Sequence, residues 1–127
     1  MKDSNSLGSF GETRAALYLK SKGYNIIQMN FRCRSGEIDI IAADREYIVF
    51  AEVKLRKDDQ YGSAAAFVDK RKQRKIMTAA RYYLAYKDPG LQPRFDVIEV
   101  YAPFGERGAV EIYHIEDAFS YGSLYNS

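Results

Sequence analysis

The sequence predicts a single α/β domain in which a mixed five-stranded sheet is flanked by two helices. One long segment of helical periodicity, residues 68–86, separates two groups of β-rich runs, and a shorter amphipathic segment precedes the first group. At 127 residues, the chain is long enough for one hydrophobic core and too short for two. We expect this domain to span residues 8–119, with flexible segments at residues 1–7 and 120–127.

The predicted elements follow in the order αβββαββ. The first helix is expected at residues 10–22, because Ser9 is a favourable N-cap, Glu12 completes a capping box and Gly23 can end the helix. The second helix is expected at residues 68–86, where apolar residues recur at helical spacing. Runs rich in β-branched and aromatic residues predict five strands, at residues 25–31, 37–42, 48–54, 94–100 and 111–115.

Composition and cysteine content favour a cytoplasmic protein. No apolar run approaches the roughly 20 residues that a membrane-spanning helix needs. Residues 1–10 contain no apolar segment typical of a secretory signal. The single cysteine, Cys33, cannot form an internal disulfide, which fits a reducing compartment. We therefore expect no membrane association.

Two acids and a lysine in the predicted hairpin form the main candidate site. Glu52 and Lys54 are two residues apart on one strand, so their side chains leave the same face. A four-residue turn at residues 44–47 would place Asp39 directly opposite Glu52, with Cβ atoms about 5 Å apart. Opposed carboxylates repel each other, and a divalent cation such as Mg²⁺ would compensate. Lys54 could orient a water molecule or stabilise charge that develops on a phosphate.

An exposed salt-bridge cluster is the alternative interpretation of these three residues, worth about 0–1 kcal/mol per pair. The residues that flank Asp39 and Glu52 are nearly all apolar, which is typical of central strands covered on both faces. Acids at the end of such strands are less readily explained as solvated side chains.

Polar residues on the two predicted helices extend the candidate site. Glu12 is either a capping-box acid or, because it shares the apolar face of its helix with Leu19, a carboxylate that points towards the hairpin. Lys72 and Gln73 continue the apolar stripe of the second helix, so they could contact a phosphate or extend to the rim. His114, the single histidine, is expected to be structural.

A series of motifs over residues 8–119 resembles the YraN-like family of small bacterial proteins. The motifs are Gly11-Glu12, Gly36-Glu37-Ile38-Asp39-Ile40-Ile41, Glu52-Val53-Lys54, Lys72-x-x-Lys75-Ile76, Arg94-Phe95-Asp96-Val97 and His114-Ile115. That family is similar to the PD-(D/E)xK nuclease superfamily and akin to archaeal Holliday junction resolvases. The resemblance therefore implies a restriction-endonuclease-like fold. Ala51 is a mild departure, because relatives usually carry a larger β-branched residue before the glutamate.

The resemblance implies an endonuclease that uses Mg²⁺ or Mn²⁺ to hydrolyse branched or structured DNA, with RNA less favoured. The implied catalytic residues are Asp39, Glu52, Lys54, Glu12 and Gln73. The implied metal ligands are Asp39, Glu52, Glu12 and the carbonyl of Val53. Clustered basic residues would hold the nucleic-acid backbone: Arg34, Arg56, Lys57, Lys72, Arg74 and Lys75. Resolvases of this fold act as dimers, so a homodimer is a further expectation.

Two rival hypotheses remain at the level of sequence. A non-catalytic nucleic-acid-binding or adaptor module would keep the acids for structure. An RNA-directed nuclease would use the same site on a different substrate. The basic clusters do not separate these hypotheses, because charge clusters are also typical of solvated faces.

Overall fold

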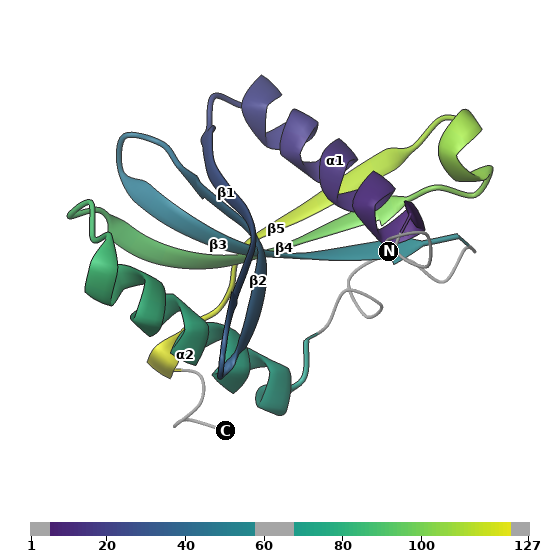
Figure 1. The fold of residues 1–127 in the computed structure, drawn as a ribbon. Helices are drawn as coiled ribbons and strands as arrows, with labels where there is room; N and C mark the ends of the chain where they lie inside the picture. Colours follow the sequence, from purple (N-terminus) through teal and green to yellow (C-terminus); the bar gives the residue numbers. More distant parts are fainter. Residues whose placement is uncertain (1–5, 58–67, 123–127) are drawn as a thin grey trace.

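The computed structural model describes residues 6–57 and 68–122, and within them a five-stranded sheet lies between two α-helices (Figure 1). The order αβββαββ and the mixed sheet confirm the predicted architecture. The elements are α1 (Ser6–Ser21), β1 (Asn25–Cys33), β2 (Gly36–Ala43), β3 (Tyr47–Arg56), α2 (Lys70–Tyr86), β4 (Gln92–Tyr101), the short 3₁₀ helix η2 (Gly105–Arg107) and β5 (Glu111–Phe119).

The strands lie side by side in chain order, and each neighbouring pair is antiparallel except β3 and β4, which are parallel. A parallel pair needs a crossover connection, and α2 provides it. The helices α1 and α2 cover opposite faces of the sheet (Figure 1). Phe50 and Tyr83 belong to the core on the α2 side, whereas Leu19, Val49 and Ile98 belong to the core on the α1 side.

Helix α1 begins earlier than the capping pattern predicts. It starts at Ser6, so Ser9 lies inside the helix and the predicted N-cap and capping box are wrong. A serine within a helix costs only about half a kcal/mol relative to alanine, so the helix can continue through it. The predicted end is confirmed, because the N–H groups of Gly23 and Tyr24 donate to the carbonyls of Lys20 and Leu19 at 3.0 Å, as in a Schellman motif.

Helix α2 begins after an N-cap that lies inside its predicted range. The Asp69 side chain accepts a hydrogen bond from the Lys72 N–H at 2.9 Å, and the helix runs from Lys70 to Tyr86. Val68, predicted as helical, instead packs in the core on the α2 side. No helix in the described part of the chain is both long and apolar enough to cross a membrane.

The segment that follows β5 contacts the sheet and α2 through Tyr121. The Tyr121 ring packs edge-on against Phe95, with ring centroids 5.5 Å apart, and the Arg81 guanidinium lies over it at 5.0 Å. Tyr121, which lies within the segment 120–127 expected to be flexible, thus packs its ring on an apolar surface. The expected flexible residues 1–5 and 123–127 lie outside the described part, whereas residues 6 and 7 belong to α1.

Candidate active site

The β2–β3 hairpin has the register that the sequence predicts. Ala43 pairs with Ile48, and the ladder continues to Ile40 and Ala51. At the turn, the Asp44 carboxylate accepts hydrogen bonds from two backbone N–H groups at 2.8 Å, which fixes where the turn lies. The next pair in this register would be Asp39 and Glu52.

Where the backbone hydrogen bonds between β2 and β3 end, the Asp39 side chain of β2 accepts a hydrogen bond from the backbone of β3. Its Oδ2 accepts the Val53 N–H at 2.8 Å, and the backbone pairing of the two strands ends one step earlier, at Ile40 and Ala51. Because the N–H and C=O of one strand residue point to the same neighbour, the Val53 carbonyl also leaves β3 on the Asp39 side. Asp39 and Glu52 are 8% and 9% exposed, so two acids are buried at this end of the hairpin.

The electrostatics of the two acids reflect this burial. Burial, followed by repulsion from Glu52, raises the pKa of Asp39 to about 7. Burial also raises the pKa of Glu52, although the positive charges of Lys72 and Lys54 oppose this shift. The ionised pair is therefore unfavourable unless a cation lies close to it.

Lysine side chains supply part of that positive charge. Lys72 reaches from the first turn of α2 to Glu52, with 3.5 Å between Nζ and Oε2. This confirms that Lys72 faces the sheet. Lys54 lies on the same strand face as Glu52 and is half-buried.

Gln73 also faces the sheet, as predicted. Its side chain is 6% exposed, and its Nε2 donates to the Val68 carbonyl at 2.7 Å. Its Oε1 is buried and has no hydrogen-bond partner among the described residues. An unsatisfied buried acceptor costs about 1–3 kcal/mol, so this oxygen can receive a hydrogen bond from a ligand or a water molecule.

Glu12 lies within electrostatic reach of Asp39. It is half-buried, and its pKa is raised first by burial and then by Asp39, while a hydrogen bond with the Asn30 side chain lowers it. No group of three or more histidine, cysteine, aspartate or glutamate side chains in the described ranges is arranged to hold a metal ion. The structure therefore brings Asp39 and Glu52 together and leaves Glu12 at longer range.

Sequence analysis missed Asn30. This residue has a φ of +54°, and the facing of side chains along β1 changes across it: Met29 packs on the α1 side and Phe31 on the α2 side. Asparagine tolerates this left-handed conformation better than most residues. The Asn30 side chain is hydrogen-bonded to Glu12. The contact between Asn30 of β1 and Glu12 of α1 is a tertiary contact, and no pattern of neighbouring residues predicts it.

The predicted nucleic-acid-binding residues lie in different places. Arg56 pairs with the fully buried Glu99, with 3.5 Å between Nε and Oε2. Lys57 and Arg74 are exposed. The other three predicted residues, Arg34, Lys72 and Lys75, line one cavity. Arg32, which was not among the predicted residues, lines the same cavity.

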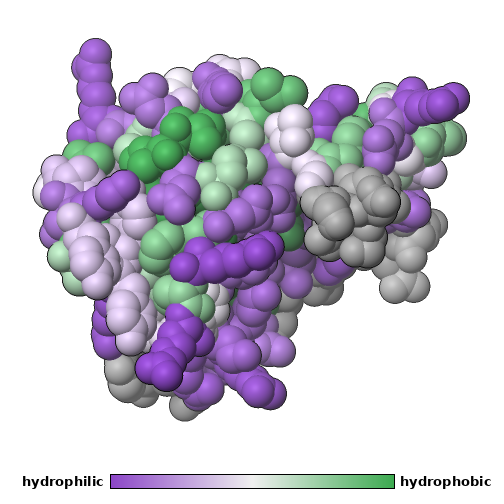
Figure 2. Space-filling model, in the orientation of Figure 1, coloured by the Kyte–Doolittle hydropathy of each residue, from purple (hydrophilic) through white to green (hydrophobic). Residues whose placement is uncertain are grey.

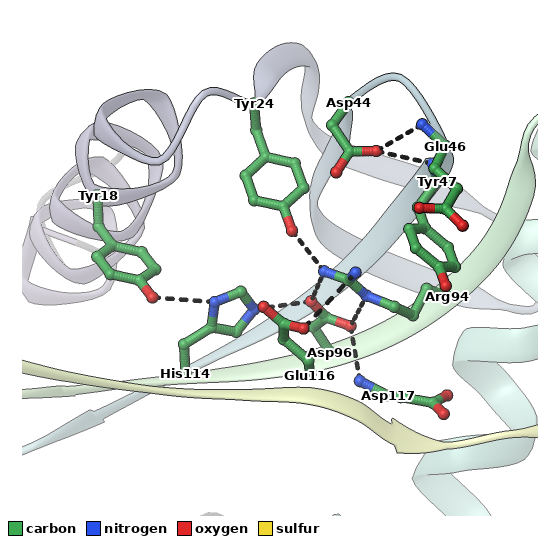
Figure 3. A network of polar contacts seen from close by, with 10 residues as sticks. All are labelled: Tyr18, Tyr24, Asp44, Glu46, Tyr47, Arg94, Asp96, His114, Glu116 and Asp117. Carbon is green, nitrogen blue, oxygen red and sulfur yellow. Dashed lines mark hydrogen bonds and ion pairs between the residues drawn. The ribbon is translucent and has the colours of Figure 1, made fainter.

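A second polar network joins Tyr18 of α1 to His114 of β5 and Asp96 of β4 (Figure 3). Asp96 is fully buried and accepts hydrogen bonds from Arg94 at 2.8 and 2.9 Å, and its Oδ2 lies 2.7 Å from His114 Nε2. The other ring nitrogen of His114 lies 3.1 Å from the Tyr18 hydroxyl, and Arg94 donates to the Tyr24 hydroxyl at 2.6 Å. These bonds connect α1 to β4 and β5.

Comparison with known proteins gives a family match over most of the chain. A family model described as "Uncharacterised protein family UPF0102" matches residues 11–100. A UPF0102 protein of Caldanaerobacter subterraneus is 44% identical over 115 residues, which cover 90% of this chain and 94% of the relative. One of Clostridium acetobutylicum is 45% identical over 113 residues, or 88% and 92% of the two chains. One of Clostridium botulinum strain 657 is 52% identical over 96 residues, or 74% and 78%.

Proposed function

The chain belongs to the uncharacterised protein family UPF0102, which is the YraN-like family, and we propose that this member is a metal-dependent endonuclease centred on Asp39 and Glu52. One observation carries the proposal. Two buried acids, Asp39 and Glu52, lie on neighbouring strands, and the pKa of Asp39 is raised to about 7. Such an arrangement destabilises the folded protein, and carboxylates with strongly shifted pKa values are commonly found in active sites.

The donor atoms fit Mg²⁺ or Mn²⁺. Two carboxylates and the Val53 carbonyl are oxygen ligands, which these hard cations prefer, and Mg²⁺ usually keeps several waters. Two acids therefore suffice, and Glu12 would act through a water molecule. A bound ion would polarise a phosphoryl oxygen and lower the pKa of a bound water.

The lysines and Gln73 complete the proposed site. The Lys54 ammonium would orient the attacking water and stabilise negative charge on the phosphate. Lys72 neutralises part of the Glu52 charge at 3.5 Å and can also attract a phosphate oxygen. The unpartnered Oε1 of Gln73 would accept a hydrogen bond from a water molecule at the start of α2.

The proposed substrate is nucleic acid, with branched or structured DNA favoured over RNA, in the cytoplasm. This preference rests on the similarity of the family to resolvases, which also suggests a homodimer. Cleavage of matched DNA and RNA structures would decide between the two substrates.

A Glu52→Gln variant tests the proposal, because it removes one carboxylate while keeping the shape of the side chain. We expect Mg²⁺-dependent cleavage of a panel of branched and single-stranded DNAs to fall by about 100-fold or more. Glu46→Gln is the matched control, since Glu46 is an exposed acid on the same hairpin, and it should cleave as the wild type does. Equal cleavage by the wild type and Glu52→Gln would reject the proposal.

A non-catalytic nucleic-acid-binding module is the second candidate. It is favoured by the Lys72–Glu52 ion pair, which gives the acids a partner without metal, and by the lack of a three-acid cluster in the described ranges. Addition of Mg²⁺ separates the two candidates. The nuclease proposal expects a rise in melting temperature that Asp39→Asn abolishes, whereas the binding module expects no rise.

A further inference from the structure

A cavity of about 380 Å³ lies between the turn that joins β1 to β2 and the first two turns of α2. Clefts of this size are typical of small-ligand sites. Hydrophilic side chains gather at the lower edge of the molecule, where this turn meets α2 (Figure 2). The cavity is lined by Arg32, Cys33, Arg34, Ser35, Gly36, Glu37, Lys72 and Lys75.

The charged side chains of this cavity are mostly positive. Four lining residues are arginine or lysine, and the one acid, Glu37, is paired with Arg32 at 3.1 Å between Nε and Oε1. Lys72 is paired with Glu52, which does not line the cavity, so Arg34 and Lys75 are the lining cations that no lining carboxylate neutralises. Arginine and lysine in this arrangement recognise phosphate oxygens through charge-assisted hydrogen bonds.

Gly36 allows the two walls of the cavity to approach each other. A Cβ at this position would lie 3.3 Å from the Lys75 Cβ and 3.5 Å from the Lys75 carbonyl oxygen, and the φ of +153° also disfavours a side chain. The turn with Arg34 is thereby placed beside Lys75 of α2. Two cations from distant parts of the sequence share one cavity as a result.

The cavity also adjoins the candidate active site. Lys72 lines it and lies 3.5 Å from Glu52, and Glu37 lines it two residues before Asp39 on the same strand. We propose that this cavity binds a phosphate group of a nucleic-acid strand, next to the phosphate that is cleaved. The proposal rests on the proposed nuclease function and adds a second contact point for its substrate.

Binding measured without metal tests this site independently of cleavage. The probe is a 20-nucleotide single-stranded DNA with an internal fluorescein, titrated by fluorescence anisotropy in EDTA at several KCl concentrations. We expect Arg34→Gln and Lys75→Gln each to weaken binding about 5- to 10-fold at 100 mM KCl. Each should also reduce the salt dependence, log Kobs against log[KCl], by about 0.7, which is the value for one lost phosphate contact on a single strand.

Arg71→Gln is the matched control, because Arg71 is exposed on α2, carries the same charge and does not line the cavity. It should bind within about twofold of the wild type. If Arg34→Gln and Lys75→Gln behave like Arg71→Gln, the cavity does not bind phosphate and the proposal is overturned. Circular dichroism of each variant ensures that folded proteins are compared.

The probe in three forms identifies which phosphate is bound. Strands with a 5′-phosphate, a 3′-phosphate or two hydroxyl ends are compared. Tighter binding of one phosphorylated strand, lost in Arg34→Gln, would support a terminal phosphate. Equal binding of all three strands, weakened by Arg34→Gln, would support an internal phosphodiester. Loss of binding in the cavity variants with no cleavage by the wild type would retain this site and reject the nuclease function.

Discussion

At the scale of single residues, the protonation of Asp39 makes the stability of the metal-free protein depend on pH. Its folded-state pKa of about 7 lies above its ordinary value of 3.8, so the folded protein keeps a proton that the unfolded chain releases. This contribution to the free energy of unfolding is complete below about pH 4 and is lost as the pH rises to 7. Each pKa unit corresponds to about 1.4 kcal/mol, which sets an upper limit of about 4 kcal/mol.

We predict that Asp39→Asn stabilises the metal-free protein at pH 7.5 and flattens its stability between pH 4 and pH 7. The amide keeps an oxygen that can accept the Val53 N–H and removes the repulsion from Glu52. Urea unfolding in EDTA at several pH values measures the effect. Glu106→Gln, at an exposed acid of η2, is the control and should follow the wild-type curve. A wild-type stability that rises steadily from pH 4 to pH 7 would contradict the assignment.

Asn30 combines an unusual backbone conformation with a contact to Glu12. Asn30→Gly is expected to keep the backbone, because glycine adopts a φ of +54° without strain, and to remove the side-chain amide. The free energy of unfolding should change by less than about 1 kcal/mol, since Asn30 is exposed. The pKa of Glu12, followed by carbon-13 NMR, should rise because a hydrogen bond that lowers it is lost. An unchanged Glu12 titration would show that Asn30 does not act on this carboxylate.

At the scale of secondary-structure elements, the contact between the β1–β2 turn and α2 depends on Gly36. We predict that Gly36→Ala destabilises the protein by about 2–4 kcal/mol, because it adds backbone strain and forces Cβ against Lys75. Gly90→Ala is the matched control, since its φ of +78° is also left-handed but its Cβ would meet nothing within 4 Å. Urea midpoints measure both. Equal losses would mean that backbone strain alone matters and that the contact with Lys75 adds nothing.

The elements also indicate how far the sequence predicts this molecule. In the described part of the chain, β-rich runs predicted the strands, and capping signals and helical periodicity predicted the two α-helices. A four-residue turn predicted the hairpin register that places Asp39 beside Glu52. These features depend on neighbours in the chain. The start of α1 and the reversal at Asn30 were missed, because tertiary packing decides between local alternatives of similar free energy. The sequence predicted that the Lys72 side chain points towards the sheet, but it did not predict that Lys72 forms an ion pair with Glu52.

At the scale of the whole molecule, α1 connects with two polar systems, the acid pair and the network of Asp96. Glu12 of α1 is within electrostatic reach of Asp39, and Tyr18, further along the same helix, lies 3.1 Å from His114 in the network of Asp96. The network thus holds the helix that carries Glu12 against the sheet. The acid pair is unfavourable in the absence of metal, whereas in the network the buried carboxylate of Asp96 is paired with Arg94.

Asp96→Asn should therefore destabilise the protein by about 3–5 kcal/mol at pH 7, because it leaves the buried Arg94 without its carboxylate. The pKa of Asp96 is lowered by hydrogen bonds with His114, Arg94 and the Asp117 N–H, which outweigh its burial. Its stabilising contribution is present above its ordinary value of 3.8 and is lost as the pH falls through its lower folded-state value. Wild-type stability should consequently fall below about pH 4, and this fall should be smaller in Asp96→Asn.

Urea unfolding from pH 7 to pH 2.5 measures both effects, with Glu116→Gln as the control. Glu116 pairs with the same arginine at 3.8 Å, but its side chain is 60% exposed, so its loss should cost less than about 0.5 kcal/mol. The comparison isolates burial, because both variants remove one carboxylate from Arg94. Equal and small losses in the two variants would mean that α1 is held on the sheet by its apolar contacts alone, and that the network contributes little to the position of Glu12.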